Sequence, residues 1–234
     1  MRGAAATDKR IEDRAARQAR IEKAAEQVFA QRGVWAATMD EIGRHAGVSK
    51  GALYLHFESK EQLYLMLASR ALQELIDKLE SLPAEGKGFK RTRAIIETYA
   101  NYSVSDPARF RLAGAWVAPD WQLPNSEALA EKYAELVRKA LRLAVEAFEL
   151  GKRDGSIHEH LDTQLTILQF IGGMHGVVAL QAKVLDPPEQ APPQLDPQLW
   201  AGLVKQPNDP APNIDHKSIV TSYTELMLSA IERH

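Results

Sequence analysis

Three hydroxyl side chains stand where helices would begin within one short stretch of the chain. Thr38, Ser49 and Ser59 lie within 22 residues of one another, and each precedes a run of residues with helical spacing of apolar side chains. A hydroxyl at such a position accepts a hydrogen bond from a free backbone amide. The remaining amides and the helix dipole attract phosphate oxygens. The spacing therefore indicates a phosphate-binding surface.

The helix that follows Ser49 has the dimensions of a DNA-reading helix. It begins with Lys50, Gly51 and Ala52, which are one cation and two small residues. Such a slim end is what the major groove, about 12 Å wide, admits. A tight turn through Gly47 separates this helix from the one capped by Thr38, and two short helices joined in this way form a helix-turn-helix.

Other residue types that could do chemistry give weaker patterns. His158, Glu159 and His160 are possible zinc ligands, but residues two apart do not share a helix face and no third ligand has a recognisable spacing. The sequence contains no nucleophile elbow and no Walker or Rossmann glycine pattern. It contains no cysteine, which excludes thiolate sites and suits a reducing cytoplasm. We therefore expect no enzyme activity, no metal and no cofactor.

Helical elements account for most of the chain. An apolar stripe precedes Gly33, and two capping boxes, Thr38 with Glu41 and Ser59 with Gln62, open further helices. Helical periodicity then continues over 89–104, 107–117, 126–150, 162–184 and 214–232. The proline-rich segment 186–212 is predicted to be an irregular connector. No comparable strand pattern is present, so the predicted class is all-α.

Composition and charge agree with a globular protein. The chain has 234 residues, of which 45% are hydrophobic and 26% charged, and its net charge is −2. Residues 1–60 hold 11 basic and 8 acidic side chains, so the front of the chain is basic and the remainder acidic. The uncharged segment 163–182 contains too many polar groups for a membrane span and is interpreted as a buried helix. No N-terminal secretory signal is visible.

The stretch TMDEIGRHAGVSKGALYLHFESKE at residues 38–61 resembles the signature of the tetracycline-repressor (TetR) family of transcriptional regulators. The resemblance extends over about 60 residues, from near Arg17 to Asp77. It implies a helix-turn-helix domain at 17–77 and an effector-binding and dimerisation domain at 78–234. The basic residues that precede the first apolar stripe indicate an N-terminal arm at 1–16 that reaches DNA, or else a solvated helix end.

The same resemblance implies roles for single residues of the DNA-binding domain. Phosphate contacts would come from Thr38, Tyr54, His56 and Lys60, with Ser49 as a further cap at the DNA surface. Base contacts would come from Lys50, Gly51 and Ala52. Lysine donates to guanine O6 and N7, whereas the two small residues would read by close approach or by contact with a thymine methyl group. The operator sequence stays open.

The remaining expectations concern dimerisation and the effector. The resemblance implies a four-helix dimer bundle, to which the uncharged helix would contribute Phe170, Gly172, Gly173, Gly176, Val177 and Leu180. It also implies a cavity for a small hydrophobic effector, for which the candidates are Tyr99, Tyr102, Phe110, Trp116, Trp121 and Phe148. Aromatic residues at helical spacing are more often plain core.

We expect a cytoplasmic regulator, specifically a ligand-released repressor that binds a palindromic operator in double-stranded DNA as a homodimer. A rival interpretation keeps DNA binding but drops the ligand, and has the C-terminal domain bind a protein partner.

Overall fold

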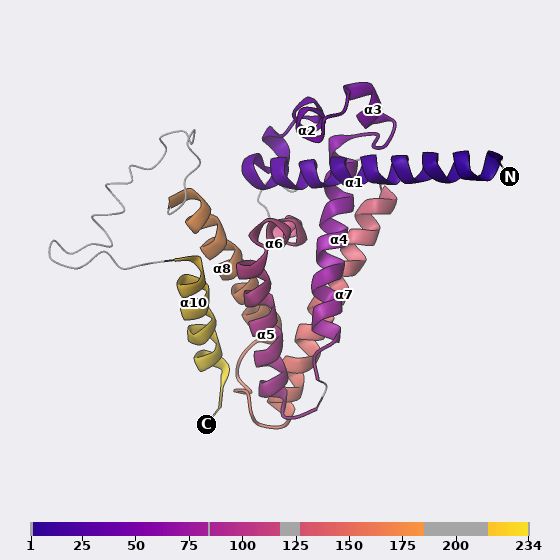
Figure 1. The fold of residues 1–234 in the computed structure, drawn as a ribbon. Coiled ribbons are helices and arrows are strands. Elements are labelled where there is room, and N and C mark those ends of the chain that lie inside the picture. The colour runs from indigo at the N-terminus through magenta and orange to yellow at the C-terminus, as the bar shows by residue number, and fades with distance from the viewer. Residues whose placement is uncertain (1, 84, 118–126, 185–214, 234) are drawn as a thin grey trace, which may run out of the picture. The chain divides into compact units, whose positions relative to one another are not determined.

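The computed structural model describes residues 2–83, 85–117, 127–184 and 215–233, with side chains described from Arg14 onward and, in the helix beginning at Thr163, up to Ala179. In these ranges every regular element is a helix (Figure 1), which confirms the predicted all-α class. None of these helices combines the length and apolar character that crossing a bilayer requires. The predicted connector at 186–212 lies outside the described residues.

The helices form two compact units. The N-terminal unit comprises residues 1–74 and 108–137, and the C-terminal unit comprises residues 75–107 and 138–234. Two of the boundaries fall inside helices, α4 (Lys60–Glu80) and α7 (Glu127–Arg153), so each of these helices belongs to both units.

The N-terminal unit holds the predicted helix-turn-helix. Its elements are α1 (Arg2–Ala36), α2 (Met39–Ala46), α3 (Lys50–Tyr54), the first part of α4, α6 (Pro107–Ala113), the 3-10 helix η1 (Ala115–Val117) and the first part of α7. Gly33, with a φ of 73°, interrupts the helical backbone of α1 where the sequence predicts a helix end. Residues 2–16, which the sequence predicts as an arm, lie in the helical part of α1 that precedes this interruption.

Apolar side chains from four helices form the core of the N-terminal unit. Ile21 of α1, Ile42 of α2, Leu53 of α3 and Leu63 of α4 each have no exposed surface. Burying one such side chain contributes roughly 1.5–3 kcal/mol. This core fixes the orientation of α3, which is too short at five residues to be stable alone.

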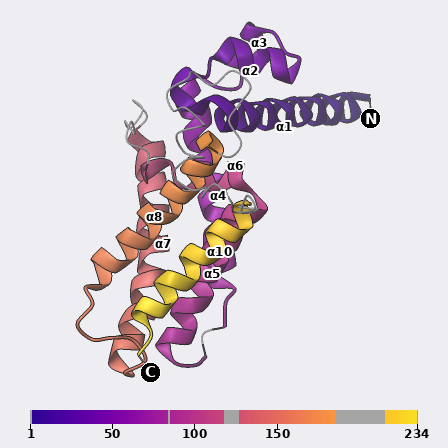
Figure 2. The same ribbon diagram turned by 90° about the vertical axis from the view of Figure 1, so that its left-hand side faces the viewer.

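In the C-terminal unit α5 (Gly88–Ser105), α8 (Thr163–Val184) and α10 (His216–Ile231) lie side by side (Figure 2). Their shared core includes Ile96, Met174 and Leu228, all nearly inaccessible to solvent.

One end of the C-terminal unit is closed by close backbone contacts. A Cβ on Gly88 would lie 1.9 Å from the backbone nitrogen of Gly151, so only glycine fits there. The Asp154 carboxylate accepts a hydrogen bond from the Gly88 amide at 2.6 Å. Hydrogen bonds from Ser156 and from this amide lower the pKa of Asp154. The Arg233 amide, just beyond α10, donates to the Ser156 carbonyl at 3.1 Å.

Candidate nucleic-acid interface

Side-chain caps and a left-handed glycine set the geometry of the helix-turn-helix. Thr38 Oγ1 accepts a hydrogen bond from the Glu41 amide at 3.2 Å, as a capping residue does. Gly47 ends α2 with a φ of 65°, in the left-handed region of backbone conformation, which residues other than glycine rarely adopt. Glu41 does not complete the predicted capping box, because its carboxylate forms an ion pair with Arg32 of α1 at 2.7 Å.

The reading helix α3 is capped and half exposed. Ser49 Oγ accepts a hydrogen bond from the Ala52 amide at 3.2 Å. Leu53 is fully buried on the inner face, whereas Gly51 lies on the exposed face with no atom within 4 Å of where a Cβ would stand. The exposed face of α3 therefore offers a slim, open surface, as the sequence predicts.

Lys50, the first residue of α3, forms an ion pair with Asp40 of α2. The ammonium nitrogen lies 3.0 Å from Oδ1 and 3.3 Å from Oδ2 of the carboxylate. Both side chains are about 60% exposed, at 62% for Lys50 and 61% for Asp40. The hydrogen bond from Lys50 to Asp40, with the attraction between the charges, raises the pKa of Lys50.

Tyr54 and His56 lie at the end of α3 and just beyond it. Tyr54 is 45% exposed and free to approach a phosphate. His56 is partly buried, and burial lowers the pKa of its imidazole, with a further contribution from Arg14 and Arg17. These two arginines are exposed on α1.

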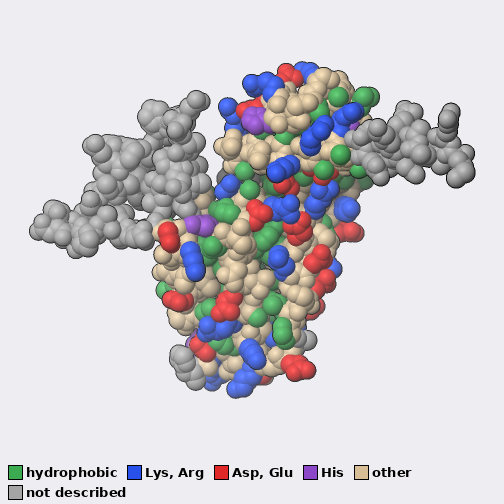
Figure 3. Space-filling model, viewed as in Figure 1, with side chains coloured by type: hydrophobic (Ala, Val, Ile, Leu, Met, Phe, Trp, Pro, Cys, Tyr) green, Lys and Arg blue, Asp and Glu red, His purple; other side chains and the backbone are tan. Residues whose placement is uncertain are grey.

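Positive side chains lie on the surface of the N-terminal unit. Figure 3 shows lysine and arginine side chains over the part that α1, α2 and α3 form. Those with exposed side chains in this stretch are Arg14, Arg17, Arg20, Lys23, Arg32, Arg44 and Lys50. Such a concentration is the electrostatic footprint expected of a phosphate-binding surface.

Lys60 contacts backbone groups far from it in the sequence, which the sequence alone does not predict. Its ammonium donates to the carbonyl oxygens of Trp35 at 3.2 Å and of Ala37 at 3.1 Å. These bonds connect the first residue of α4 to the last turn of α1 and to the segment that joins α1 to α2. Lys60 therefore holds the start of α4 against the backbone that leads into the helix-turn-helix.

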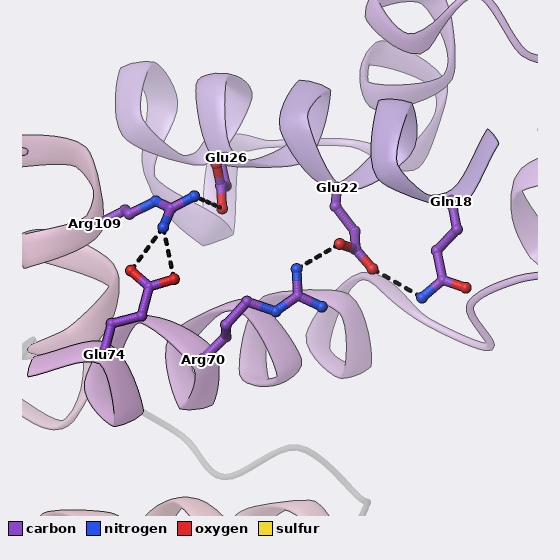
Figure 4. A network of polar contacts seen from close by, with 6 residues as sticks. All are labelled: Gln18, Glu22, Glu26, Arg70, Glu74 and Arg109. Carbon is purple, nitrogen blue, oxygen red and sulfur yellow. Dashed lines mark hydrogen bonds and ion pairs between the residues drawn. The ribbon is translucent and has the colours of Figure 1, made fainter. Parts of the chain in front are cut away.

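A polar network that the sequence analysis missed holds α1 in place (Figure 4). Arg70 of α4 pairs with Glu22 of α1 at 2.5 Å, and Gln18 donates to the same carboxylate at 2.8 Å. Arg109 of α6 pairs with Glu74 of α4 at 2.6 Å and lies 3.7 Å from Glu26 of α1. We call these six residues the α1 clamp.

The aromatic residues expected to line an effector cavity fall into both units. Phe110, in the N-terminal unit, and Tyr102 and Phe148, in the C-terminal unit, are core residues with at most 4% of their surface exposed. Trp116, in the N-terminal unit, is partly exposed, and Trp121 lies outside the described residues.

Tyr99 is the candidate with a polar partner. Its hydroxyl lies 2.9 Å from Nε2 of His175 on α8, within the C-terminal unit. Burial raises the pKa of Tyr99 and lowers that of His175 to about 4, so the imidazole is neutral at physiological pH. A neutral imidazole and a phenol offer hydrogen-bonding groups among apolar side chains.

The residues expected at the dimer interface separate into two faces of α8. Gly172 and Gly176 are exposed, with nothing within 4 Å of a Cβ position. Gly173 instead faces α10 of the same chain, where a Cβ would lie 2.0 Å from the Tyr223 hydroxyl oxygen. Phe170 is buried and stacks on the Tyr223 ring with centroids 5.9 Å apart. Val177 is partly buried, and the side chain of Leu180 lies outside the described ones.

The possible metal ligands lie together at the surface of the C-terminal unit. His158, Glu159 and His160 line an open hollow of about 440 Å³ together with Arg233. No group of three or more metal-binding side chains with suitable geometry occurs within the described ranges.

Comparison with known proteins gives the context of this geometry. Residues 21–67 match the family described as bacterial regulatory proteins, tetR family. The chain is 33% identical over 139 residues to the transcriptional activator FasR of Mycolicibacterium smegmatis, which covers 58% of this chain and 59% of that protein. It is 28% identical over 138 residues to the repressor KstR2 of Rhodococcus jostii, covering 59% and 66%. The matches thus span less than two thirds of each relative.

A solved structure extends the likeness to the whole fold. FadR of Bacillus subtilis, determined in complex with stearoyl-CoA, has a TM-score of 0.62 and 18% identity, over 92% of this chain and 100% of that one. Residues 21–67, the range that matches the family, contain the helix-turn-helix of the N-terminal unit. This part of the chain therefore carries the likeness to the tetR family of bacterial regulatory proteins.

Proposed function

We propose that this chain is a cytoplasmic transcriptional regulator, a ligand-released repressor that binds a palindromic operator as a homodimer. The observation that carries the proposal is the capped α2–turn–α3 unit, whose inner face is held by Leu53 while Gly51 and Lys50 stay exposed. Its first and second helices have the arrangement in which a helix-turn-helix enters the major groove.

In this proposal the amides and side chains around α3 fix the protein on the DNA backbone. Thr38 and Ser49 stand at the N-termini of α2 and α3, and Tyr54 lies exposed at the end of α3. Phosphate contacts of this kind set register, whereas base-edge contacts carry the sequence information. Lys50 is the cation proposed to read a base, which its exposed position at the start of α3 supports.

Dimerisation is proposed to use the exposed face of α8. Leu165 and Leu168 are 56% and 50% exposed and share a stripe with Gly172 and Gly176, at intervals of three and four residues. Leu226 of α10 adds an apolar side chain that is 65% exposed. Glycines on such a stripe let the α8 backbones of two chains approach closely. The dimer would then carry two copies of α3 related by a twofold axis, which would match half-sites about 34 Å apart.

The effector is proposed to be a largely apolar small molecule that binds within the aromatic-rich helices. Tyr99 and His175 support a ligand that also carries a polar group, because they bring hydrogen-bonding atoms among apolar neighbours. A protein of the same fold, B. subtilis FadR, was solved with stearoyl-CoA, which combines a long apolar chain with polar groups. A ligand that favours the non-binding state by about 1–3 kcal/mol would give useful derepression.

Selection of duplexes from a random pool by the full chain tests the proposal directly. We expect a palindromic motif to be enriched, a dimer on sedimentation, and an affinity that falls steeply with salt. A screen of acyl and other lipophilic compounds by thermal shift, followed by operator release, tests the effector. Recovery of no sequence preference would contradict DNA reading, and stabilising compounds that never release DNA would contradict the ligand switch.

A further inference from the structure

The Asp40–Lys50 pair places a carboxylate on a surface where negative charge is costly. Both side chains are more than half exposed, and they lie on α2 and α3, the two helices of the DNA-reading motif. An exposed ion pair contributes little to stability, because solvent screens it and two long side chains must be held in one geometry. Asp40 would also repel DNA phosphates. Stability alone is therefore a weak reason for a carboxylate at this position.

The geometry of the pair matches a feature of the major groove. Nζ of Lys50 is a donor and Oδ1 of Asp40 an acceptor, and these two atoms are 3.0 Å apart. In a G·C base pair, guanine O6 is an acceptor and cytosine N4 a donor, and they are hydrogen bonded to each other at about 2.9 Å. The pair thus presents a donor and an acceptor at the spacing of the complementary groups of one G·C pair.

We propose that Asp40 is a second specificity-determining residue, which acts with Lys50 to read one G·C base pair in each half-site. Lys50 donates to guanine O6 and, with another of its N–H groups, to N7, while Asp40 accepts from cytosine N4. This inference rests on the proposed function, because it assigns a base pair to the same reading helix.

The pair also limits binding to other sequences. On DNA without the matching base pair the Lys50 charge remains paired with Asp40, so the protein gains one phosphate contact fewer. At the matching site Lys50 donates to guanine and Asp40 accepts from cytosine, so the carboxylate no longer lowers the affinity. Asp40 therefore lowers affinity for random DNA and widens the gap between specific and random sites.

The test measures base preference and random-DNA affinity for the full chain and for Asp40→Ala. With the operator selected by the wild type, every base pair of a half-site is replaced in turn and binding is followed by fluorescence anisotropy. We expect Asp40→Ala to reduce the preference for G·C at one position by about five-fold or more, within the range of a bidentate contact. Preferences at other positions should hold, and random duplex should bind more tightly with a salt slope steeper by about 0.9.

Two further variants separate base reading from a structural role. Glu80→Gln removes an acidic residue from a comparable surface ion pair, Lys139–Glu80 at 2.9 Å, in the C-terminal unit, and should leave base preference unchanged. The swapped variant Asp40→Lys/Lys50→Asp keeps an ion pair but exchanges donor and acceptor. We expect it to fold and to lose the G·C preference.

The outcomes distinguish the two proposals. Unchanged base preference in Asp40→Ala, or wild-type preference in the swapped variant, would overturn the role of Asp40 while leaving DNA reading intact. A wild-type chain that prefers no duplex sequence would overturn the proposed function and this inference with it.

Discussion

At the scale of single residues, His175 should make the stability of the protein depend on pH. Its pKa in the folded chain is about 4 because of burial, against 6.5 for an ordinary histidine. Between these values the unfolded chain binds a proton that the folded chain does not, so stability falls as pH is lowered. We expect a loss of about 2 kcal/mol from this group between pH 7.5 and pH 5.

Urea unfolding of the wild type and His175→Gln at the two pH values measures this effect. The variant should be less stable than the wild type at pH 7.5 but should lose less stability on acidification. Parallel losses in both proteins would show that His175 does not carry the pH dependence.

Lys60 should matter for stability as well as for any phosphate contact. Lys60→Met removes the two hydrogen bonds to the carbonyls of Trp35 and Ala37. Because the ammonium is partly exposed, we expect a loss of about 1 kcal/mol in the free energy of unfolding. Lys23→Met, at an exposed position of α1, serves as the control and should change it by less than about 0.5 kcal/mol. If Lys60→Met and Lys23→Met changed the free energy of unfolding equally in urea denaturation, the two hydrogen bonds of Lys60 would not stabilise the protein.

At the scale of elements, the α1 clamp should fix the helix that supports the reading motif. Glu22 is buried, with 7% of its surface exposed, and its carboxylate depends on Arg70. Arg70→Met would leave this charge without its cation. Since Arg70 itself is half exposed, we expect a cost of about 2 kcal/mol, below that of a fully buried pair.

A double-mutant cycle measures the coupling within the clamp. Glu22→Leu/Arg70→Met removes both charges and should be more stable than Arg70→Met alone, because no unpaired carboxylate remains. Additive losses in the cycle would show that the two side chains are not coupled.

The element scale also shows what sequence reasoning can and cannot predict. Thr38, Ser49 and Gly47 act on amides and carbonyls a few residues away, so local rules predicted the helix boundaries well. The clamp joins Arg70 to Glu22 across 48 residues, and no local pattern encodes that pairing. The face on which Gly173 lies depends likewise on Tyr223, which the chain supplies 50 residues later.

Charges at functional surfaces show the same limit. The resemblance implied a phosphate contact for Lys60 and a base contact for Lys50 but not the carbonyl or carboxylate partners they have in the folded chain. The sequence alone gives no sign that Asp40 pairs with Lys50, because the turn between α2 and α3 is what brings the two side chains together.

At the scale of the whole molecule, the exposed stripe of α8 should control assembly. Gly176→Leu places a bulky side chain where nothing lies within 4 Å in the single chain. The variant should therefore fold normally but force partner helices apart, with a dimer dissociation constant at least about ten-fold higher. Operator affinity should fall in parallel, because the two half-sites lose their linkage.

Sedimentation equilibrium at several concentrations checks this expectation. Lys90→Leu, at an exposed position of α5, adds a surface leucine elsewhere and is the matched control. A Gly176→Leu chain that dimerises as the wild type does would place the interface on another surface.

Each unit is built from two separate segments of the chain, and this order affects folding during translation. The N-terminal unit needs residues 108–137 as well as 1–74, and the clamp residue Arg109 comes from that second segment. A ribosome must therefore translate all of 75–107 before the reading unit can close. In a nascent chain released step by step, protection of α1 from protease should rise only after residue 137 has left the exit tunnel. A fragment that stops after α4 would lack Arg109, the arginine that pairs with Glu74, and we expect it to be less stable than the same helices in the full chain.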